Sequence, residues 1–301
     1  MAPWLRIALA AARSWQADNV FKHSAAVSFY TLFSLAPVLI IVLAVAALFL
    51  GREAAADQLQ RQVDALVGPA SGELVKAAIA AGQTQKDSRI ATAVGFGLLV
   101  FGATTVFAQL QESMNQIWDV RSKPRQRGWL VLVVHRLLSF AMVLIIGFLL
   151  LVSLVLTTAI TQALGHFKGG VLSSPLLMQA ADLTVGLLVI MVLFALLLKV
   201  LPDVKLRWRD VAVSAALTAV LFTGGRYLIA FYLGHSTVAS IYGAAGSLVA
   251  LLIWVYYSCA ILFYGVEFTR AYRQAHRLRT VPKDNAVLVR EELVESRRAA
   301  R

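Results

Sequence analysis

Charged residues are scarce in this sequence. Asp, Glu, Lys and Arg make up 15% of its 301 residues, whereas soluble domains carry about 25%. Cys259 is the single cysteine, which excludes a disulfide framework and a metal site of paired cysteines. The five histidines are scattered without ligand spacing, and there is no phosphate-binding loop, HExxH motif or GxSxG motif. We therefore expect no enzymatic activity, no catalytic residue, no metal site and no cofactor.

Hydrophobic residues dominate instead, at 59% of the chain, and they are collected into long runs. The last run holds 25 consecutive uncharged residues, from Tyr242 to Val266, and about 20 apolar residues suffice for a helix to cross a bilayer core. We expect the rest of the chain to be organised around this helix. The sequence predicts an all-α integral membrane protein whose transmembrane domain, residues 24–269, has six helices, at 24–50, 90–110, 129–164, 177–201, 211–233 and 241–269.

Three more polar parts accompany these helices. Residues 1–23 are predicted as a basic amphipathic N-terminus. They lack the small-residue cleavage pattern of a removable signal, so we do not expect this segment to be cleaved off. Residues 51–89, between the first two helices, are predicted as an insert of one or two amphipathic helices broken at Gly68-Pro69. Residues 270–301 are a basic tail, and a short helix or disorder both stay open for the part after about Thr280.

The distribution of positive charge predicts the orientation of the chain. Twenty Lys and Arg lie in the N-terminus, the loops 111–128 and 199–210 and the tail, against six in the insert and the two remaining loops. By the positive-inside rule both termini are cytoplasmic and the insert is extracytoplasmic. Topology then explains the net charge of +12. We expect the lipid bilayer as a partner and no nucleic acid, since the basic segment QAHRLRT (274–280) has no aromatic residue to stack on bases.

Hydroxyl side chains gather on the cytoplasmic half of the first predicted helix. Ser24, Ser28 and Thr31 follow helical spacing, and Ser34 lies on the adjacent strip. Two interpretations stay open: hydrogen bonding between packed helices, or a polar wall that lines a cavity. Pro37 removes a backbone donor and predicts a kink beside this strip.

The second predicted helix ends in a similar polar strip. Thr104, Gln111 and Asn115 share one side of that helix. A solvated helix end and a substrate pathway explain this strip equally well.

Ionisable groups are predicted at two depths within the helices. Asp182 and Arg226 lie about 7 and about 10 Å from the outer helix ends, and their opposite charges predict an ion pair or a shared polar cavity. Arg136 lies about 10 Å from the cytoplasmic end of its helix, and we expect it near Glu267 or Glu112. Snorkelling to lipid headgroups is the alternative for both arginines. With the hydroxyl strip and an aromatic zone between the two depths, these groups make up a candidate pathway: Ser28, Thr31, Ser34, Arg136, Asp182, Arg226, Tyr256 and Glu267.

Four segments are recognisable in their order along the chain: AAVSFYTLFSLAPVLI (25–40), MNQIWDV (114–120), LPDVKLRWRDV (201–211) and GSLVALLIWVYYSCAILFYGVEFT (246–269). Together they resemble the YihY / virulence-factor BrkB family, over about residues 10–280. The resemblance implies a six-helix bacterial inner-membrane protein. It also implies an association with serum resistance, with envelope lipid or lipopolysaccharide processes, and in some members with export or cation/proton exchange. It carries over no catalytic residue.

Two hypotheses of function follow from these observations, and a third, which comes from an older family label, ranks below them. The first is a transporter or exporter of an envelope-related substrate, amphiphilic or lipid-like, that works through a cavity among the helices. The second is a membrane scaffold for envelope assembly or serum resistance that does not transport. The third is an older family label, ribonuclease BN, which finds no acid–base or metal cluster in this sequence.

Overall fold

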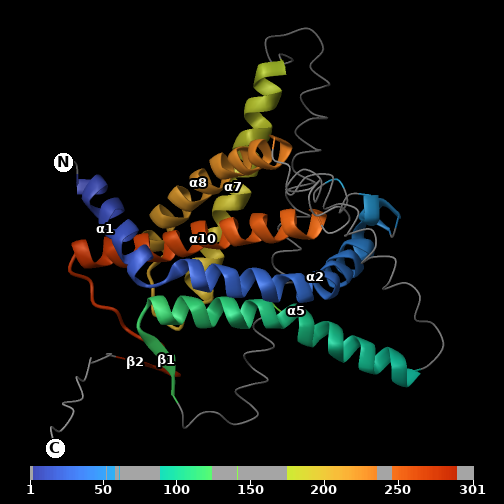
Figure 1. Cartoon of the computed structure of the whole chain (residues 1–301), viewed down its shortest axis with the longest axis horizontal. Helices are drawn as coiled ribbons and strands as arrows, with labels where there is room; N and C mark the ends of the chain where they lie inside the picture. The colour runs from blue at the N-terminus through green and yellow to red at the C-terminus, as the bar shows by residue number, and fades with distance from the viewer. Residues whose placement is uncertain are drawn as a thin grey trace, which may run out of the picture.

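The computed structural model describes residues 3–51, 53–57, 61, 89–123, 141, 175–235 and 246–289. This part of the chain is mainly helical (Figure 1). In chain order its elements are α1 (Pro3–Ala17), α2 (Val20–Leu50), α5 (Arg89–Ile117), β1 (Val120–Ser122), α7 (Pro175–Val200), α8 (Trp208–His235), α10 (Gly246–Ala275) and β2 (Ala286–Leu288).

Five of the described helices coincide with predicted membrane helices. Three of them contain segments that are long and apolar enough to cross a membrane, at Leu183–Val200, Trp208–Ile229 and Leu248–Ala275. The helices α2 and α5 occupy the first two predicted positions with lengths of 31 and 29 residues. The third predicted helix and the Gly68-Pro69 break lie outside the described residues.

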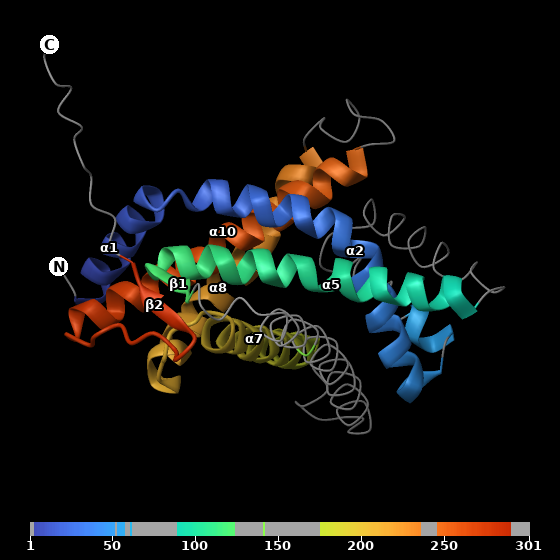
Figure 2. The same ribbon diagram turned by 90° about the horizontal axis from the view of Figure 1, so that it is seen from below.

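Helix α10 occupies the centre of the bundle and contacts each of the other five described helices, as predicted for the organising helix. Helix α2 packs against both α5 and α10, and α8 packs against both α7 and α10 (Figures 1 and 2). Val255, Phe263 and Val266 of α10 belong to one buried hydrophobic cluster with Met114 of α5 and Leu198 of α7. The core of the bundle therefore follows α10.

The close approach of α8 to α10 depends on two glycines. A Cβ atom at Gly265 would lie 2.2 Å from Oγ1 of Thr218. A Cβ atom at Gly225 would lie 2.1 Å from Oη of Tyr257. Distances this short are impossible for real atoms, so glycine at these positions allows the two helices to pack as closely as they do.

Helix α2 is continuous from Val20 to Leu50 and includes Pro37. Both views show that this helix changes direction along its length (Figures 1 and 2). A proline within a helix removes one backbone hydrogen bond and clashes with the carbonyl four residues earlier, so the bend agrees with the predicted kink.

Residues 276–289, the described chain beyond α10, fold back over one end of the bundle, where α1 also lies (Figures 1 and 2). Arg277 adopts a left-handed conformation (φ 55°), and the Leu278 N–H donates to the Arg273 carbonyl at 2.9 Å, which closes the helix. The returning chain then forms β2, which pairs antiparallel with β1. The prediction of a short helix or disorder after about Thr280 is therefore wrong for Ala286–Leu288: pairing with β1, which lies far away in the sequence, determines this conformation.

Candidate functional site

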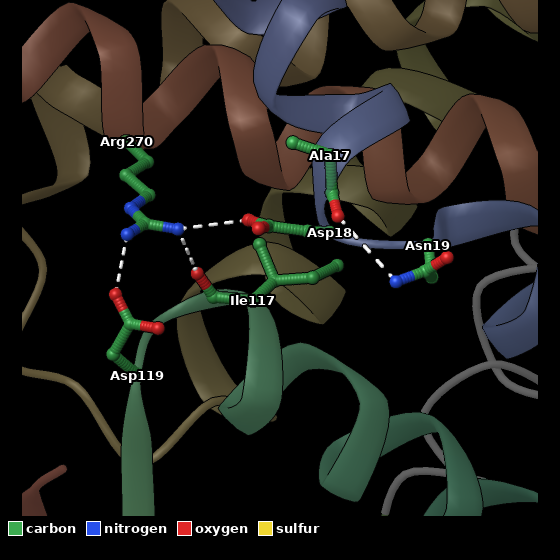
Figure 3. A network of polar contacts seen from close by, with 6 residues as sticks. All are labelled: Ala17, Asp18, Asn19, Ile117, Asp119 and Arg270. Carbon is green, nitrogen blue, oxygen red and sulfur yellow. Dashed lines mark hydrogen bonds and ion pairs between the residues drawn. The ribbon is translucent and has the colours of Figure 1, made fainter. Parts of the chain in front are cut away.

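Arg270, in the last turns of α10, joins three segments of the chain (Figure 3). Its guanidinium donates to the Asp18 carboxylate at 2.9 Å and to the Ile117 carbonyl at 2.6 Å. The same group also pairs with the Asp119 carboxylate. One side chain thereby fastens the α1–α2 turn and the end of α5 to α10, and we call these residues, with Glu267, the α10 polar cluster.

Two local turns bring the acidic partners of Arg270 into place. Asn19 and Asp119 have left-handed φ angles of 52° and 53°, a conformation that Asn and Asp tolerate better than other non-glycine residues. The turn at Asn19 ends α1 and begins α2, so that Asp18 faces α10 (Figure 3). The turn at Asp119 ends α5 and begins β1.

Glu267, one turn before Arg270 on α10, is fully buried, with an exposed fraction of 0%. Neither of its carboxylate oxygens has a hydrogen-bond partner among the residues that the structure describes. Asp18, Arg270 and Asp119 are its charged neighbours. Burial of an ionisable group without a hydrogen-bonding partner is unfavourable in any protein interior, and within a membrane helix such a group usually marks a binding or transport function.

A buried ion pair lies one turn further along α10. Arg273 Nη1 and Asp210 Oδ2 are 2.5 Å apart, and both side chains are less than 10% exposed. Arg273 also donates to the Arg279 carbonyl at 2.8 Å, so the returning chain covers it. Asp210 lies in the first turn of α8, where a negative charge also interacts favourably with the helix dipole. The pair therefore fixes the end of α10 against the start of α8.

A second polar centre forms around Asp203, in the loop between α7 and α8. Its buried carboxylate accepts hydrogen bonds from Asn115 at 2.9 Å, Asn285 at 3.2 Å and Gln111 at 3.4 Å. The Asp203 backbone N–H in turn donates to Oδ1 of Asn115 at 2.8 Å. Gln111 and Asn115 are thus buried in a hydrogen-bond network, which excludes a solvated helix end, one of the two interpretations of this strip; the other, a substrate pathway, stays a prediction.

The returning chain is tied to this second centre by Lys283 and Asp284. Lys283 Nζ donates to the Val200 carbonyl at the end of α7, at 2.9 Å, and burial lowers the pKa of this amine. The exposed Asp284 carboxylate accepts a hydrogen bond from Lys205 at 2.6 Å. This hydrogen bond and the positive charge of Lys205 lower the pKa of Asp284.

The predicted hydroxyl strip lies on α2, and most of it is buried. Ser28 donates to the Ala25 carbonyl at 2.9 Å, Thr31 to the Val27 carbonyl at 2.8 Å, and Ser34 to the Thr31 carbonyl at 3.2 Å. Each of these bonds stays within α2, so the hydroxyl groups are satisfied without a partner helix. Their role in a pathway stays a prediction.

The other predicted pathway residues are dispersed. Arg136 and the side chain of Asp182 lie outside what the structure describes, so their proposed partners stay predictions. Arg226 donates to the Tyr227 hydroxyl at 3.2 Å and lies over the ring of that residue. Tyr256 stacks on Phe21, with ring centroids 6.4 Å apart. Glu267 is thus the only residue of the predicted pathway that the described part of the structure places in the α10 polar cluster.

Sequence reasoning missed most residues of the two polar centres and of the buried ion pair. Arg270 and Arg273 were assigned to a separate basic tail, but α10 continues to Ala275 and carries both inward. Their spacing, three and six positions after Glu267, was the available signal, since such residues share one side of a helix. Asp18 and Asp203 are isolated acidic residues in otherwise basic segments, and this contrast was the signal for both.

The described residues contain no group of three or more His, Cys, Asp and Glu side chains that could hold a metal ion. The chemistry available in the α10 polar cluster is therefore that of a carboxyl group and a guanidinium in a membrane helix. Such a pair can bind a charged headgroup or exchange partners during a conformational change.

Comparison with known proteins identifies the family to which the chain is similar. The family model described as "Virulence factor BrkB" matches residues 11–287, a range that extends through most of the returning chain and ends within β2. No solved structure shows a significant match.

Several relatives named UPF0761 membrane protein are similar to the chain. The protein of Tolumonas auensis is 32% identical over 61% of this chain and 58% of its own length. That of Vibrio campbellii is 26% identical over 84% of this chain and 78% of its own. That of Pseudomonas paraeruginosa is 27% identical over 90% of this chain and 64% of its own. The matched region thus spans less than two thirds of two of these three relatives.

Proposed function

Because this chain belongs to the virulence factor BrkB family, a family of membrane proteins, we propose that it is a bacterial inner-membrane transporter or exporter of an envelope-related, amphiphilic or lipid-like substrate. In this proposal the chain spans the membrane six times, with both termini cytoplasmic and the insert at residues 51–89 on the opposite side. We propose neither an enzymatic step nor a cofactor.

The proposed orientation is supported by where the charged segments lie. The basic N-terminus, the α7–α8 loop and the chain after α10 meet at one end of the bundle (Figures 1 and 2). This end carries the segments that the positive-inside rule assigns to the cytoplasm. Three segments with predicted cytoplasmic location thus share one side of the described structure.

The observation that carries the transport proposal is Glu267. Its carboxyl is fully buried and has no hydrogen-bond partner within the described ranges. It lies in a segment apolar enough to span the membrane, where this arrangement lowers the stability of the fold. Such groups are typical of substrate and ion pathways. The adjacent Arg270 supplies the cation that an anionic headgroup requires.

In this proposal the contacts of Arg270 close the substrate pathway at one end of the bundle. Arg270 holds the α1–α2 turn and the end of α5 against α10, and Arg273 holds the start of α8 there. Passage at this end requires these contacts to exchange for contacts with the substrate. Alternating access requires elements that switch between two discrete arrangements, and we propose these charged pairs as such an element.

The test is transport in vesicles of phosphatidylethanolamine and phosphatidylglycerol that contain the purified protein and a headgroup-labelled fluorescent phosphatidylglycerol. Dithionite bleaches only the label in the outer leaflet, unless labelled lipid crosses from the inner leaflet. We expect bleaching of inner-leaflet label in protein-containing vesicles and not in protein-free ones. Equal bleaching in both would contradict the transport proposal and favour the alternative, a membrane scaffold for envelope assembly.

A further inference from the structure

Helix α1 has three distinct faces along its length. One face is buried: Ile7 and Ala11 form a cluster with Phe268 and Ala271 of α10. The second face exposes apolar side chains, with Leu5 at 48% and Leu9 at 41%, one turn apart. The third face exposes Arg6 and Arg13, which lie seven positions, or two turns, apart. A helix on the surface of a soluble protein needs only a buried face and a polar face, so the exposed leucines require a separate explanation.

The contacts of α1 place it beside the C-terminal half of the membrane-spanning segment of α10. Near its C-terminal end, Trp15 donates to the Ala260 carbonyl at 2.9 Å. Near its N-terminal end, Trp4 stacks on Tyr272, with centroids 5.8 Å apart. Helix α1 therefore runs antiparallel along the C-terminal half of the segment Leu248–Ala275, and its N-terminal end lies beside the last turn of that segment.

Exposed tryptophans occur on α1 and at the start of α8, and the second has a basic neighbour at the end of α7. Trp4 is 52% exposed and Trp208, at the start of α8, is 56% exposed. Lys199, at the end of α7, lies over the Trp208 ring at 5.7 Å. Exposed tryptophans with adjacent basic residues are typical of the membrane–water interface.

We propose that α1 is an interfacial helix that binds the anionic phospholipids of the leaflet at this end of the bundle. Leu5 and Leu9 insert among the acyl chains, and Arg6 and Arg13 contact the phosphate groups beside them. Two arginines on the face next to the leucines match the negative charge of this surface, and the basic and apolar faces of such helices divide in this way. This inference does not depend on transport, because it requires only that α10 spans the membrane.

The experiment measures how closely α1 approaches lipid. In a Cys259→Ala background, which removes the single cysteine, a bimane fluorophore is attached at Leu9→Cys of the full chain. The protein is placed in phosphatidylcholine vesicles that contain a minority of phosphatidylglycerol, and one lipid at a time carries brominated acyl chains, which quench bimane on contact. A second reporter at Arg277→Cys, in the exposed turn after α10, serves as the water-facing control.

We expect brominated lipid to quench bimane strongly at position 9 and little at position 277. At position 9, brominated phosphatidylglycerol should quench more than its fraction of the total lipid predicts. The enrichment should be up to roughly fivefold for each arginine, and it should disappear in an Arg6→Gln/Arg13→Gln variant. An Arg277→Gln variant, which loses a charge outside α1, should keep the enrichment. Equal quenching at positions 9 and 277 would overturn the membrane location of the leucine face. Quenching in proportion to lipid composition, unchanged by the arginine variant, would overturn the anionic-lipid site.

Discussion

Asn115 and Asp203, 88 positions apart in the sequence, hold each other by two hydrogen bonds in opposite directions. The Asn115 side-chain amide donates to the Asp203 carboxylate, and the Asp203 backbone N–H donates to the Asn115 carbonyl oxygen. Because an amide side chain is both donor and acceptor, asparagine satisfies both groups at once. The contact joins the end of α5 to the loop between α7 and α8.

Replacement of Asn115 should therefore destabilise the protein. Asn115→Ala leaves the buried Asp203 carboxylate and N–H with fewer partners, at a cost of about 1–3 kcal/mol. Thermal unfolding of the detergent-solubilised protein measures this loss. Gln116→Ala, at the exposed neighbouring position, is the matched control and should leave the unfolding temperature nearly unchanged. A loss of the same size in the control would contradict the assignment.

The buried pair of Asp210 and Arg273 should show strong coupling in a double-mutant cycle. Either single change, Asp210→Ala or Arg273→Ala, leaves one buried charge without its partner, which costs about 3–5 kcal/mol. The double change removes both charges and should cost less than the sum of the single changes. The free energy of unfolding of the four proteins gives the coupling energy. Additive losses would show that the pair is not formed in solution.

Gly265 should not accept a side chain unless Thr218 is shortened. Gly265→Ala brings a methyl group to within 2.2 Å of Thr218 Oγ1, and the α8–α10 contact must open. The second change Thr218→Ala removes that oxygen and should restore part of the stability. Gly224→Ala, where nothing lies within 4 Å of the new methyl group, should be neutral or stabilising by up to about 1 kcal/mol. A neutral Gly265→Ala would contradict the observed packing.

Docking of the chain after α10 should weaken in acid. The pKa of Asp284 is lower in the folded protein than its ordinary value because Lys205 donates to the carboxylate. This contribution is complete above the ordinary pKa of aspartate, about 3.9, and it is lost as the pH falls through the lowered, folded value. Fluorescence anisotropy of a label at Val287→Cys, in a Cys259→Ala background, should therefore decrease in this acidic range.

The variant Asp284→Asn provides the control for the acid effect. Since it lacks the titrating carboxylate, its anisotropy should be lower at neutral pH and should change less on acidification. The same acid response with and without Asp284 would assign the effect to other groups.

The helices could be predicted from the sequence because their cause is local. A run such as Tyr242–Val266 is long and uncharged, and these properties alone predict a membrane helix. The bend of α2 was likewise predictable, because Pro37 acts on the backbone of its own helix.

The polar centres could not be predicted because their cause is not local. Asp203 gains its role from Asn115 and Asn285, which lie 88 and 82 positions away, and no sequence spacing reports such contacts. The boundary placed at residue 270 also separated Arg270 from Glu267, although both belong to one helix. Charged residues normally indicate that a membrane helix has ended, but here acidic residues of other segments neutralise Arg270 and Arg273.

The most direct test of the transport account compares two carboxylates in the vesicle assay with fluorescent phosphatidylglycerol. Glu267→Gln removes the ionisable group of the buried carboxyl with almost no change of shape, and Glu112→Gln does the same at an exposed position near the end of α5 that Arg270 contacts. Size-exclusion chromatography confirms that both variants are folded. We predict that inner-leaflet label bleaches at the wild-type rate with Glu112→Gln and at the protein-free rate with Glu267→Gln. Wild-type bleaching with Glu267→Gln would contradict the account.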